Sequence, residues 1–200
     1  MIALFPSKHY DVKVYPAVEN YLISAEWSDQ VPNGYGKLKL EQTGQKHIIN
    51  GKSFTARKLT RNKWFETQDQ IGYWDDFSKH IIAWQRITQQ NTFCLTENGM
   101  LVLDSLAFLS NIEEDKYWLC AFLNSNLIFK WMRWNVHEYG ESGFRLANQY
   151  VEVMPIPKPN NYKSEIEELL RNSDYKKLDS LIYRIYRLTN EEIAYIEDKI

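Results

Sequence analysis

Apolar positions are densest in a stretch that begins near residue 117 and ends at residue 158. Its first half places apolar side chains on most faces of a helix: Trp118, Leu119, Phe122, Leu123, Leu127, Phe129 and Trp131. Such a helix is typical of the inside of a domain. Polar residues, among them Asn124 and Lys130, interrupt it too often for a membrane span, which takes about 20 predominantly apolar residues. The pattern therefore predicts a core helix.

Shorter apolar runs predict strands. The run at residues 81–87 is typical of a buried strand. The sequence Glu97-Asn98-Gly99 is a turn signal, and it predicts a β-hairpin in which the flanking segments pair. Those segments are residues 92–95 and 100–103. Two further strands are expected at residues 106–109 and 149–154, and the second must stop at Pro155 because proline lacks a backbone donor.

The beginning of the chain has a mixed pattern. Residues 10–15 alternate weakly and predict a short extended segment. Pro16 suits the first turn of a helix, which is expected to run to about Glu26. Residues 30–56 are rich in glycine and lysine, and they are expected to form a loop-rich insertion.

Beyond residue 159 apolar residues recur at helical spacing and predict three short helices, the last with a capping box of Thr189 and Glu192. Together, the patterns predict an α+β fold in which a mixed or antiparallel sheet surrounds a buried helix, with a C-terminal helical cap. We expect residues 1–159 to form one domain and residues 160–200 to form a helical segment packed on it.

Composition adds a distribution of charge. A chain of 200 residues with 44% hydrophobic residues can fill the core of one domain. The formal net charge of −2 provides no overall attraction to nucleic acid. Residues 37–86, however, hold ten Lys or Arg against five Asp or Glu (10 − 5 = +5), whereas residues 160–200 hold seven against nine (7 − 9 = −2). A site for a polyanion is therefore expected in the middle of the chain.

Within that basic region, cations, amides and aromatic rings are interleaved from residue 57 to residue 74. The candidate nucleic-acid contacts are Arg57, Lys58, Arg61, Asn62 and Lys63. Cations suit phosphates and guanine edges, and amides suit adenine. The rings of Trp64, Phe65 and Trp74 could stack on bases, but we interpret them as core residues of an amphipathic helix.

Three parts of the sequence resemble one known family. The first is Arg61-Asn62-Lys63-Trp64-Phe65-Glu66-Thr67-Gln68-Asp69, followed by Tyr73-Trp74 and His80-Ile81-Ile82-Ala83-Trp84-Gln85-Arg86-Ile87. The second is Leu123-Asn124-Ser125-Asn126-Leu127. The third is Gly143-Phe144-Arg145-Leu146, followed by Tyr150-Val151-Glu152-Val153-Met154-Pro155-Ile156-Pro157. Together they are similar to the C-terminal specificity (target-recognition) domain of TaqI-like adenine-N6 DNA methyltransferases and type IIG restriction-modification enzymes. Thr67 stands where that family usually has Leu.

The resemblance spans about residues 10–200, is weakest across the 30–56 insertion, and implies a module that recognises duplex DNA sequence-specifically. Candidate base-contacting residues are Arg86, Gln89, Arg145 and Asn148. No cofactor is implied for this chain itself. S-adenosylmethionine, and Mg²⁺ where an endonuclease is fused, would belong to the parent enzyme. The implied partners are duplex DNA and an N-terminal methyltransferase domain, with or without a nuclease domain.

Catalytic motifs are missing from the sequence. It has neither an Asn/Asp-Pro-Pro-aromatic motif nor a Gly-rich cofactor turn after a strand. Asp104 with Glu114-Asp115-Lys116 has the outline of a magnesium-dependent nuclease site, but acids also suit a helix N-terminus, and we favour that interpretation. The four histidines lack the spacing of zinc ligands. Cys94 and Cys120 lie in apolar stretches and predict free buried thiols in a reducing compartment.

Other interpretations stay open. One is half of a type I restriction specificity subunit, although the breaks at residues 172–174 and 189–190 disfavour the long spacer helix of such subunits. Another is a protein-interaction module whose exposed aromatics form the interface. Residues 1–6 carry no secretory signal or membrane anchor, so we expect a cytoplasmic protein without a membrane partner.

Overall fold

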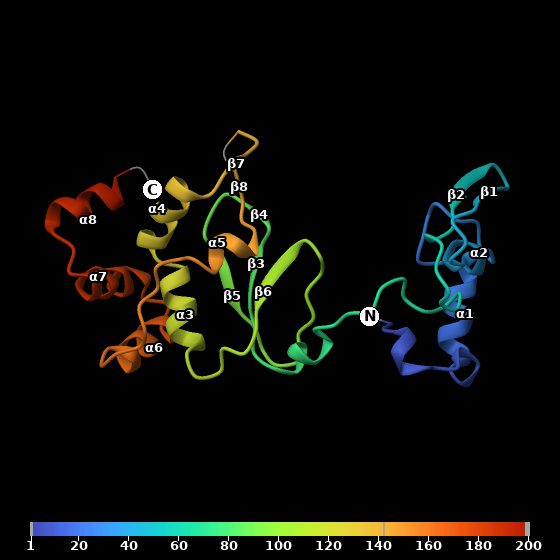
Figure 1. The fold of residues 1–200 in the computed structure, drawn as a ribbon, viewed down its shortest axis with the longest axis horizontal. Helices are drawn as coiled ribbons and strands as arrows, with labels where there is room; N and C mark the ends of the chain where they lie inside the picture. Colours follow the sequence, from blue (N-terminus) through green and yellow to red (C-terminus); the bar gives the residue numbers. More distant parts are fainter. Residues whose placement is uncertain (1, 142, 199–200) are drawn as a thin grey trace. The chain divides into compact units, whose positions relative to one another are not determined.

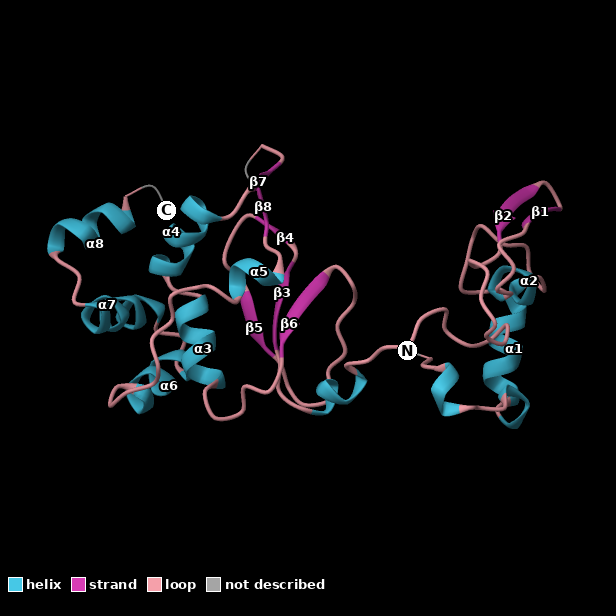
Figure 2. Cartoon of the chain, in the orientation of Figure 1, coloured by secondary structure: helices cyan, strands magenta, loops and turns pink. Residues whose placement is uncertain are grey.

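The computed structural model describes residues 2–141 and 143–198, which form two compact units, residues 1–72 and 73–200. Helices and antiparallel strands are both present, so the fold is α+β as expected (Figure 2). The predicted division into a domain of residues 1–159 and a helical segment of residues 160–200 stays a prediction.

The first unit contains two short 3₁₀ helices, Pro6–Lys8 and Val12–Val14, and two α-helices, α1 (Pro16–Ser24) and α2 (Gly36–Leu40). The extended segment predicted for residues 10–15 is therefore wrong, because Asp11 caps the second 3₁₀ helix by accepting a hydrogen bond from the Lys13 backbone N–H. The predicted helix at Pro16 is confirmed.

The expected loop-rich insertion is more ordered than its glycine content suggests. It holds α2 and a hairpin of β1 (Lys46–Ile49) and β2 (Lys52–Thr55), joined by Asn50-Gly51 (Figure 1). Helix α2 lies directly against the end of α1, because a Cβ atom added to Gly36 would stand only 2.0 Å from the Leu22 carbonyl oxygen. The glycines here permit packing as well as turning.

The second unit contains two small antiparallel sheets that share one stretch of chain, residues 82–88. After a 3₁₀ helix (Trp74–Ser78), β3 (Ile82–Gln85) pairs antiparallel with β5 (Phe93–Leu95) on one side and β6 (Leu106–Leu109) on the other. The chain then passes Arg86 into β4 (Ile87–Thr88), which pairs with β8 (Gly143–Arg145), and β8 pairs with β7 (Glu138–Tyr139). The predicted strand at residues 81–87 forms β3 and β4 and is buried at residues 81–84, but the predicted burial of Ile87 is wrong, because Ile87 is exposed. The predicted strand at residues 106–109 is confirmed as β6.

Arg86 stands at the junction of these sheets. Its backbone N–H donates to the Ser105 carbonyl, next to β6, and its own carbonyl accepts from the Leu146 N–H, next to β8. Beside this junction the indole N–H of Trp84, a fully buried ring, donates to the Leu146 carbonyl at 3.0 Å. The two sheets are thus joined through backbone and side chain together.

The predicted hairpin of residues 92–95 and 100–103 is wrong. Residues 97–99 do turn, and the Gly99 N–H donates to the Phe77 carbonyl, but residues 100–103 form no strand. β5 pairs with β3 on one edge, and the Asn124 side chain covers the backbone of Phe93 on the other. No edge of β5 is left at Phe93 for residues 100–103 to join.

The stretch predicted as one core helix contains two helices, α3 (Lys116–Leu123) and α4 (Asn126–Asn135), separated at Asn124-Ser125. Cys120 and Leu123 of α3 belong to the core that includes residues of the sheets, and Trp118 and Phe122 belong to a second core formed with the C-terminal helices. α3 therefore contributes to both cores of this unit.

The strand predicted for residues 149–154 is wrong, because a short helix, α5 (Asn148–Val151), and a turn occupy these residues. Val151 and Met154 are the buried positions, three residues apart, which suits a helical turn and not a strand. The β-branched residues that suggested a strand are split between core and solvent, since Val153 is exposed.

The three predicted C-terminal helices are confirmed as α6 (Lys163–Arg171), α7 (Tyr175–Tyr186) and α8 (Asn190–Glu197). Thr189 and Glu192 form the predicted capping box at the start of α8. Ile166, Leu178 and Ile182 pack with Trp118 and Phe122 in the second core. Across the described residues, no helix has both the length and the apolar character that crossing a membrane requires.

Candidate nucleic-acid interface

A polar groove of about 640 Å³ lies in the second unit, where β4, β7 and β8 meet the loop of residues 89–92. Three amide side chains, Gln85, Gln89 and Gln90, line it together with the hydroxyl-bearing Thr88, Thr92 and Tyr139. Glu141 adds a carboxylate. Ile87, with 53% of its surface exposed, is the large aliphatic side chain in this lining. The groove thus offers hydrogen-bond donors and acceptors around one apolar group.

The loop that carries Gln89 and Gln90 is held in place from inside. The buried Thr88 hydroxyl donates to the Gln90 carbonyl at 2.6 Å and accepts from the Gln90 N–H at 3.2 Å. The Asn91 amide donates to the carbonyls of Leu123 and Ser125, at 3.0 and 2.9 Å. These contacts fix the loop to the point where α3 ends and α4 begins.

Asn124 completes this anchor by binding both backbone polar groups of Phe93. Its side-chain oxygen accepts from the Phe93 N–H, and its NH₂ group donates to the Phe93 carbonyl, each at 2.9 Å. Ser125, its neighbour, caps α4 by accepting from the Ile128 N–H. Residues 123–127 therefore separate α3 from α4 and hold β5 and the loop of residues 89–92 in place behind the groove.

Gly143 allows β7 and β8 to approach closely at the groove. A Cβ atom at this position would lie 2.9 Å from the Tyr139 carbonyl oxygen, a backbone atom that cannot move independently. The next residues of β8, Phe144 and Arg145, point to opposite faces, because Phe144 is buried and Arg145 is exposed. Arg145 is paired directly with Ile87, so both side chains lie on the same face of the sheet.

The structure brings together some of the predicted base-contacting residues. Gln89 lines the groove. Arg145 lies on the same face of the sheet as Ile87, which also lines the groove. Arg86 is exposed, but its Nε donates to the Leu106 carbonyl at 3.3 Å, toward β6. Asn148 is exposed at the first turn of α5, three residues beyond Arg145.

Gln85, Gln90, Thr92 and Tyr139 line the groove but were not among the site residues predicted from the sequence. A usable signal was present, because residues 85–92 form a run of polar and amide residues directly after a buried strand. Loops placed at the end of a rigid strand commonly carry recognition. Tyr139 had no such signal, since it comes to the groove only through the pairing of β7 with β8.

The predicted phosphate-contacting residues belong to the first unit, and several of them support its own structure. The Arg57 guanidinium donates to the Glu66 carbonyl at 2.8 Å, and burial lowers the pKa of Arg57. The Asn62 amide donates to the carbonyls of Thr67 and Gln68. Arg57 and Asn62 therefore hold the segment of residues 66–68 in place.

The other cations of this segment are more open to solvent. Lys58 pairs with Asp69 at 2.8 Å, and Lys63 lies 3.9 Å from Glu66, with both lysines exposed. The Lys58–Asp69 pair is exposed on both sides and contributes little to stability, about 0–1 kcal/mol, so a phosphate can compete for Lys58. Glu66, in contrast, is buried. Arg61 is exposed as well. Trp64 is partly buried and Phe65 is buried, but the segment is a turn and not the amphipathic helix expected for it.

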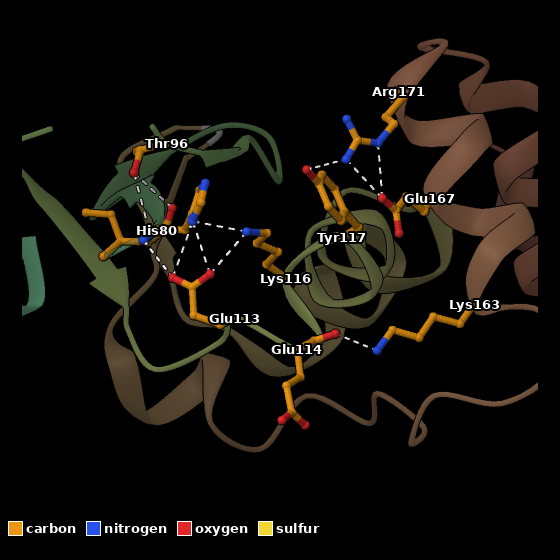
Figure 3. A network of polar contacts seen from close by, with 10 residues as sticks. His80, Thr96, Glu113, Glu114, Lys116, Tyr117, Lys163, Glu167 and Arg171 are labelled. Atoms are coloured by element: carbon orange, nitrogen blue, oxygen red, sulfur yellow. Dashed lines mark hydrogen bonds and ion pairs between the residues drawn. The ribbon is translucent and has the colours of Figure 1, made fainter. Parts of the chain in front are cut away.

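A polar network surrounds the N-terminus of α3. His80, Glu113 and Lys116 converge, with the His80 Nδ1 lying 3.1 Å from Glu113 and 3.0 Å from Lys116 (Figure 3). The hydrogen bond from the His80 backbone N–H, followed by that from Lys116, lowers the pKa of Glu113. This network joins the start of β3 to α3.

The nuclease outline at Asp104 and Glu114-Asp115 finds no support in the described residues. Lys163 of α6 donates to the Glu114 carbonyl (Figure 3). It also pairs with the Asp115 carboxylate at 3.0 Å. Among these residues no three His, Cys, Asp or Glu side chains gather as metal ligands. The Asp115 carboxylate and the Glu114 backbone carbonyl thus join the start of α3 to α6.

The two cysteines are free thiols, as predicted, but only Cys120 is buried. Burial raises the pKa of Cys120 to about 11. Cys94 is exposed because it alternates with the buried Phe93 along β5, so its predicted burial is wrong.

No protein-family model matches this chain, and neither does any curated protein. The similarity noted from the motifs is therefore carried by those motifs alone.

Proposed function

We propose that this chain is the sequence-specific duplex DNA recognition module of a restriction-modification enzyme, an adenine-N6 DNA methyltransferase with or without a fused endonuclease. The observation that carries the proposal is the meeting of motifs distant in sequence. The 123–127 run anchors the loop of the groove, the 143–146 run forms its β8 wall, and the 80–87 run supplies β3 and β4. Each of these runs resembles the same family.

The chemistry of the groove suits DNA bases. Amides line the groove and Arg145 shares a sheet face with Ile87, so these side chains can form paired hydrogen bonds with base edges, and the anchored loop reduces the entropy lost on binding. The exposed cations Lys58, Arg61 and Lys63 of the first unit would neutralise phosphates. Methyl transfer from S-adenosylmethionine belongs to the methyltransferase domain of the parent enzyme, and we assign the protein to the cytoplasm.

Fluorescence anisotropy of the full chain with a labelled duplex of randomised sequence tests the proposal, at about 50 and 200 mM salt. The affinity of the parent should fall steeply between these concentrations, because phosphate binding releases counterions. Changing Lys58, Arg61 and Lys63 together to alanine should lower the salt slope by about 2 to 3. Arg57 is left in place because it supports the fold.

The groove is tested on duplexes selected from the same pool. Arg145→Ala combined with Gln90→Ala should weaken binding to the selected sequence by about tenfold or more. The matched control is Lys176→Ala, which removes one exposed cation from α7. Absence of binding by the parent at low salt, or equal affinities of the groove variant and the control, would overturn the proposal.

A further inference from the structure

The charge of the groove indicates which part of DNA it would bind, the base edges or the phosphates. Its amides and hydroxyls are neutral, and Glu141 places a negative charge in the lining. A groove for the DNA backbone would be lined with Lys or Arg, because a carboxylate repels phosphate. The composition of this groove therefore favours base edges over the phosphate backbone.

The amide side chains narrow the choice of base. A glutamine presents a donor and an acceptor side by side, which matches N7 and the N6 amino group of adenine in the major groove. Guanine offers two acceptors there and is matched by arginine or lysine instead. Three glutamines, Gln85, Gln89 and Gln90, line this one groove.

The exposed side chain of Ile87 indicates which base is paired with the adenine. A large apolar side chain that is 53% exposed within a polar groove needs an apolar partner to gain from burial. In the major groove of DNA that partner is the C5 methyl group of thymine. Ile87 sits next to the anchored Thr88, so its backbone position is fixed before DNA arrives.

We propose that this groove recognises A·T base pairs from the major groove, with Gln90 or its neighbouring glutamines on the adenine edge and Ile87 against the thymine methyl group. The inference rests on the proposed function and specifies the bases that the site takes. Arg145, on the same face as Ile87, adds a cation suited to a guanine beside the A·T pair.

The test uses a duplex selected from a randomised pool, in which thymine is replaced by uracil or adenine by 7-deazaadenine. Uracil lacks only the methyl group, and 7-deazaadenine lacks only the N7 acceptor. The parent should lose about threefold to tenfold in affinity with either replacement. Ile87→Ala should become insensitive to uracil, and Gln90→Ala should become less sensitive to 7-deazaadenine than the parent.

The control for Ile87→Ala is Ile48→Ala, which removes an isoleucine that is 74% exposed on β1 of the other unit. This variant should keep the full sensitivity of the parent to uracil. If the parent binds the selected duplex but tolerates both replacements, A·T recognition is wrong while the DNA-binding proposal stands. If the parent binds no duplex at low salt, both fail.

Discussion

At the scale of single residues, the Asn124 side chain makes several hydrogen bonds at the end of α3. Its amide satisfies both backbone groups of Phe93 and also donates to the Cys120 carbonyl at 2.8 Å. Replacing it by alanine would leave the Phe93 N–H and C=O without these partners. Polar groups left unsatisfied in a partly buried site cost about 1–3 kcal/mol each.

We expect Asn124→Ala to lower the free energy of unfolding by about 2–4 kcal/mol, measured by urea denaturation. Asn135→Ala is the matched control, because its amide is exposed and donates to the Trp131 carbonyl one turn earlier in α4. It should cost under about 1 kcal/mol. Equal effects of the two substitutions would contradict the role given to Asn124.

Asp179 gives a prediction about pH. Burial raises the pKa of Asp179 to about 6, although its carboxylate accepts a hydrogen bond from the Asn126 N–H at 2.9 Å. Because this pKa is higher in the folded chain than in the unfolded chain, the contribution of Asp179 to stability is full below about pH 4. It is lost as the pH rises through about 6.

Asp179→Asn keeps an acceptor for the Asn126 N–H but cannot ionise. Relative to the parent, its stability should be unchanged near pH 4 and greater by about 1–2 kcal/mol at pH 7, allowing for the partial exposure of the group. Urea denaturation of both chains between these pH values checks this. Asp174→Asn is the control with the opposite sign, because Lys177 lowers the pKa of Asp174.

Residue identities predicted the site only in part. Gln89 and Arg145 could be nominated because their side chains have base-contacting chemistry. The supporting roles of Arg57 and Asn62 could not be foreseen, because their partners are backbone carbonyls whose positions depend on the folded loop. The sequence shows which residues are cations, whereas the group that each cation contacts depends on the folded structure.

At the scale of elements, the contact of α1 with α2 depends on the missing side chain of Gly36. A methyl group there would meet the carbonyl oxygens of Leu22 and Ile23 at 2.0 and 2.9 Å, and both are backbone atoms. The helices would have to separate, which breaks the packing between them.

Gly36→Ala should therefore destabilise the first unit by about 3 kcal/mol, measured by thermal or urea unfolding of the full chain. Gly72→Ala is the control, because a Cβ at Gly72 meets no atom within 4 Å. It should be neutral or stabilising by about 0.5 kcal/mol, through the lower entropy of the unfolded chain. A tolerated Gly36→Ala would contradict the close packing of α1 and α2.

Elements defined by local signals could be predicted from the sequence. α1 begins at a proline, and α8 begins at a capping box, so both starts depend on neighbours a few residues away. The hairpin predicted around residues 97–99 does not form, because β3 and the Asn124 side chain already bind the two edges of β5. Both partners are distant from β5 in sequence. Competition between distant partners has no local signature.

At the scale of the whole molecule, the two units differ in charge. Residues 1–72 hold ten Lys or Arg and seven Asp or Glu (10 − 7 = +3), and residues 73–200 hold fourteen and nineteen (14 − 19 = −5). Each unit also has its own buried clusters, since none of the four clusters found among the described residues draws members from both units. The buried clusters of the two units are therefore separate, and the excess of positive charge lies in the first unit.

A fragment of residues 73–200 should fold alone, with a cooperative urea transition and a near-UV circular dichroism signal. Its DNA affinity should be lower than that of the full chain, and its salt slope smaller, because the positive unit is absent. A fragment without a cooperative transition would contradict the independence of its cores. A fragment with an undiminished salt slope would contradict the role of the first unit.

The α+β class could be predicted because the helical spacing beyond residue 159 and the apolar runs at residues 81–87 and 106–109 are both recognisable in the sequence. The boundary between units at residue 72 was not foreseen. The composition of residues 57–74 is continuous across it, whereas the folded chain packs Tyr73 against Phe77 and Phe108 of the second unit.

The hydrogen bond from Trp84 to the Leu146 carbonyl makes this indole an optical and magnetic reporter of the groove. Leu146 directly follows Arg145, so a ligand that displaces β8 alters the electronic surroundings of a ring that is itself shielded from the ligand. In a chain grown with 5-fluorotryptophan, the ¹⁹F resonance of Trp84 can be identified among seven by its loss in Trp84→Phe. Its chemical shift would then record occupancy of the groove without any label on the DNA.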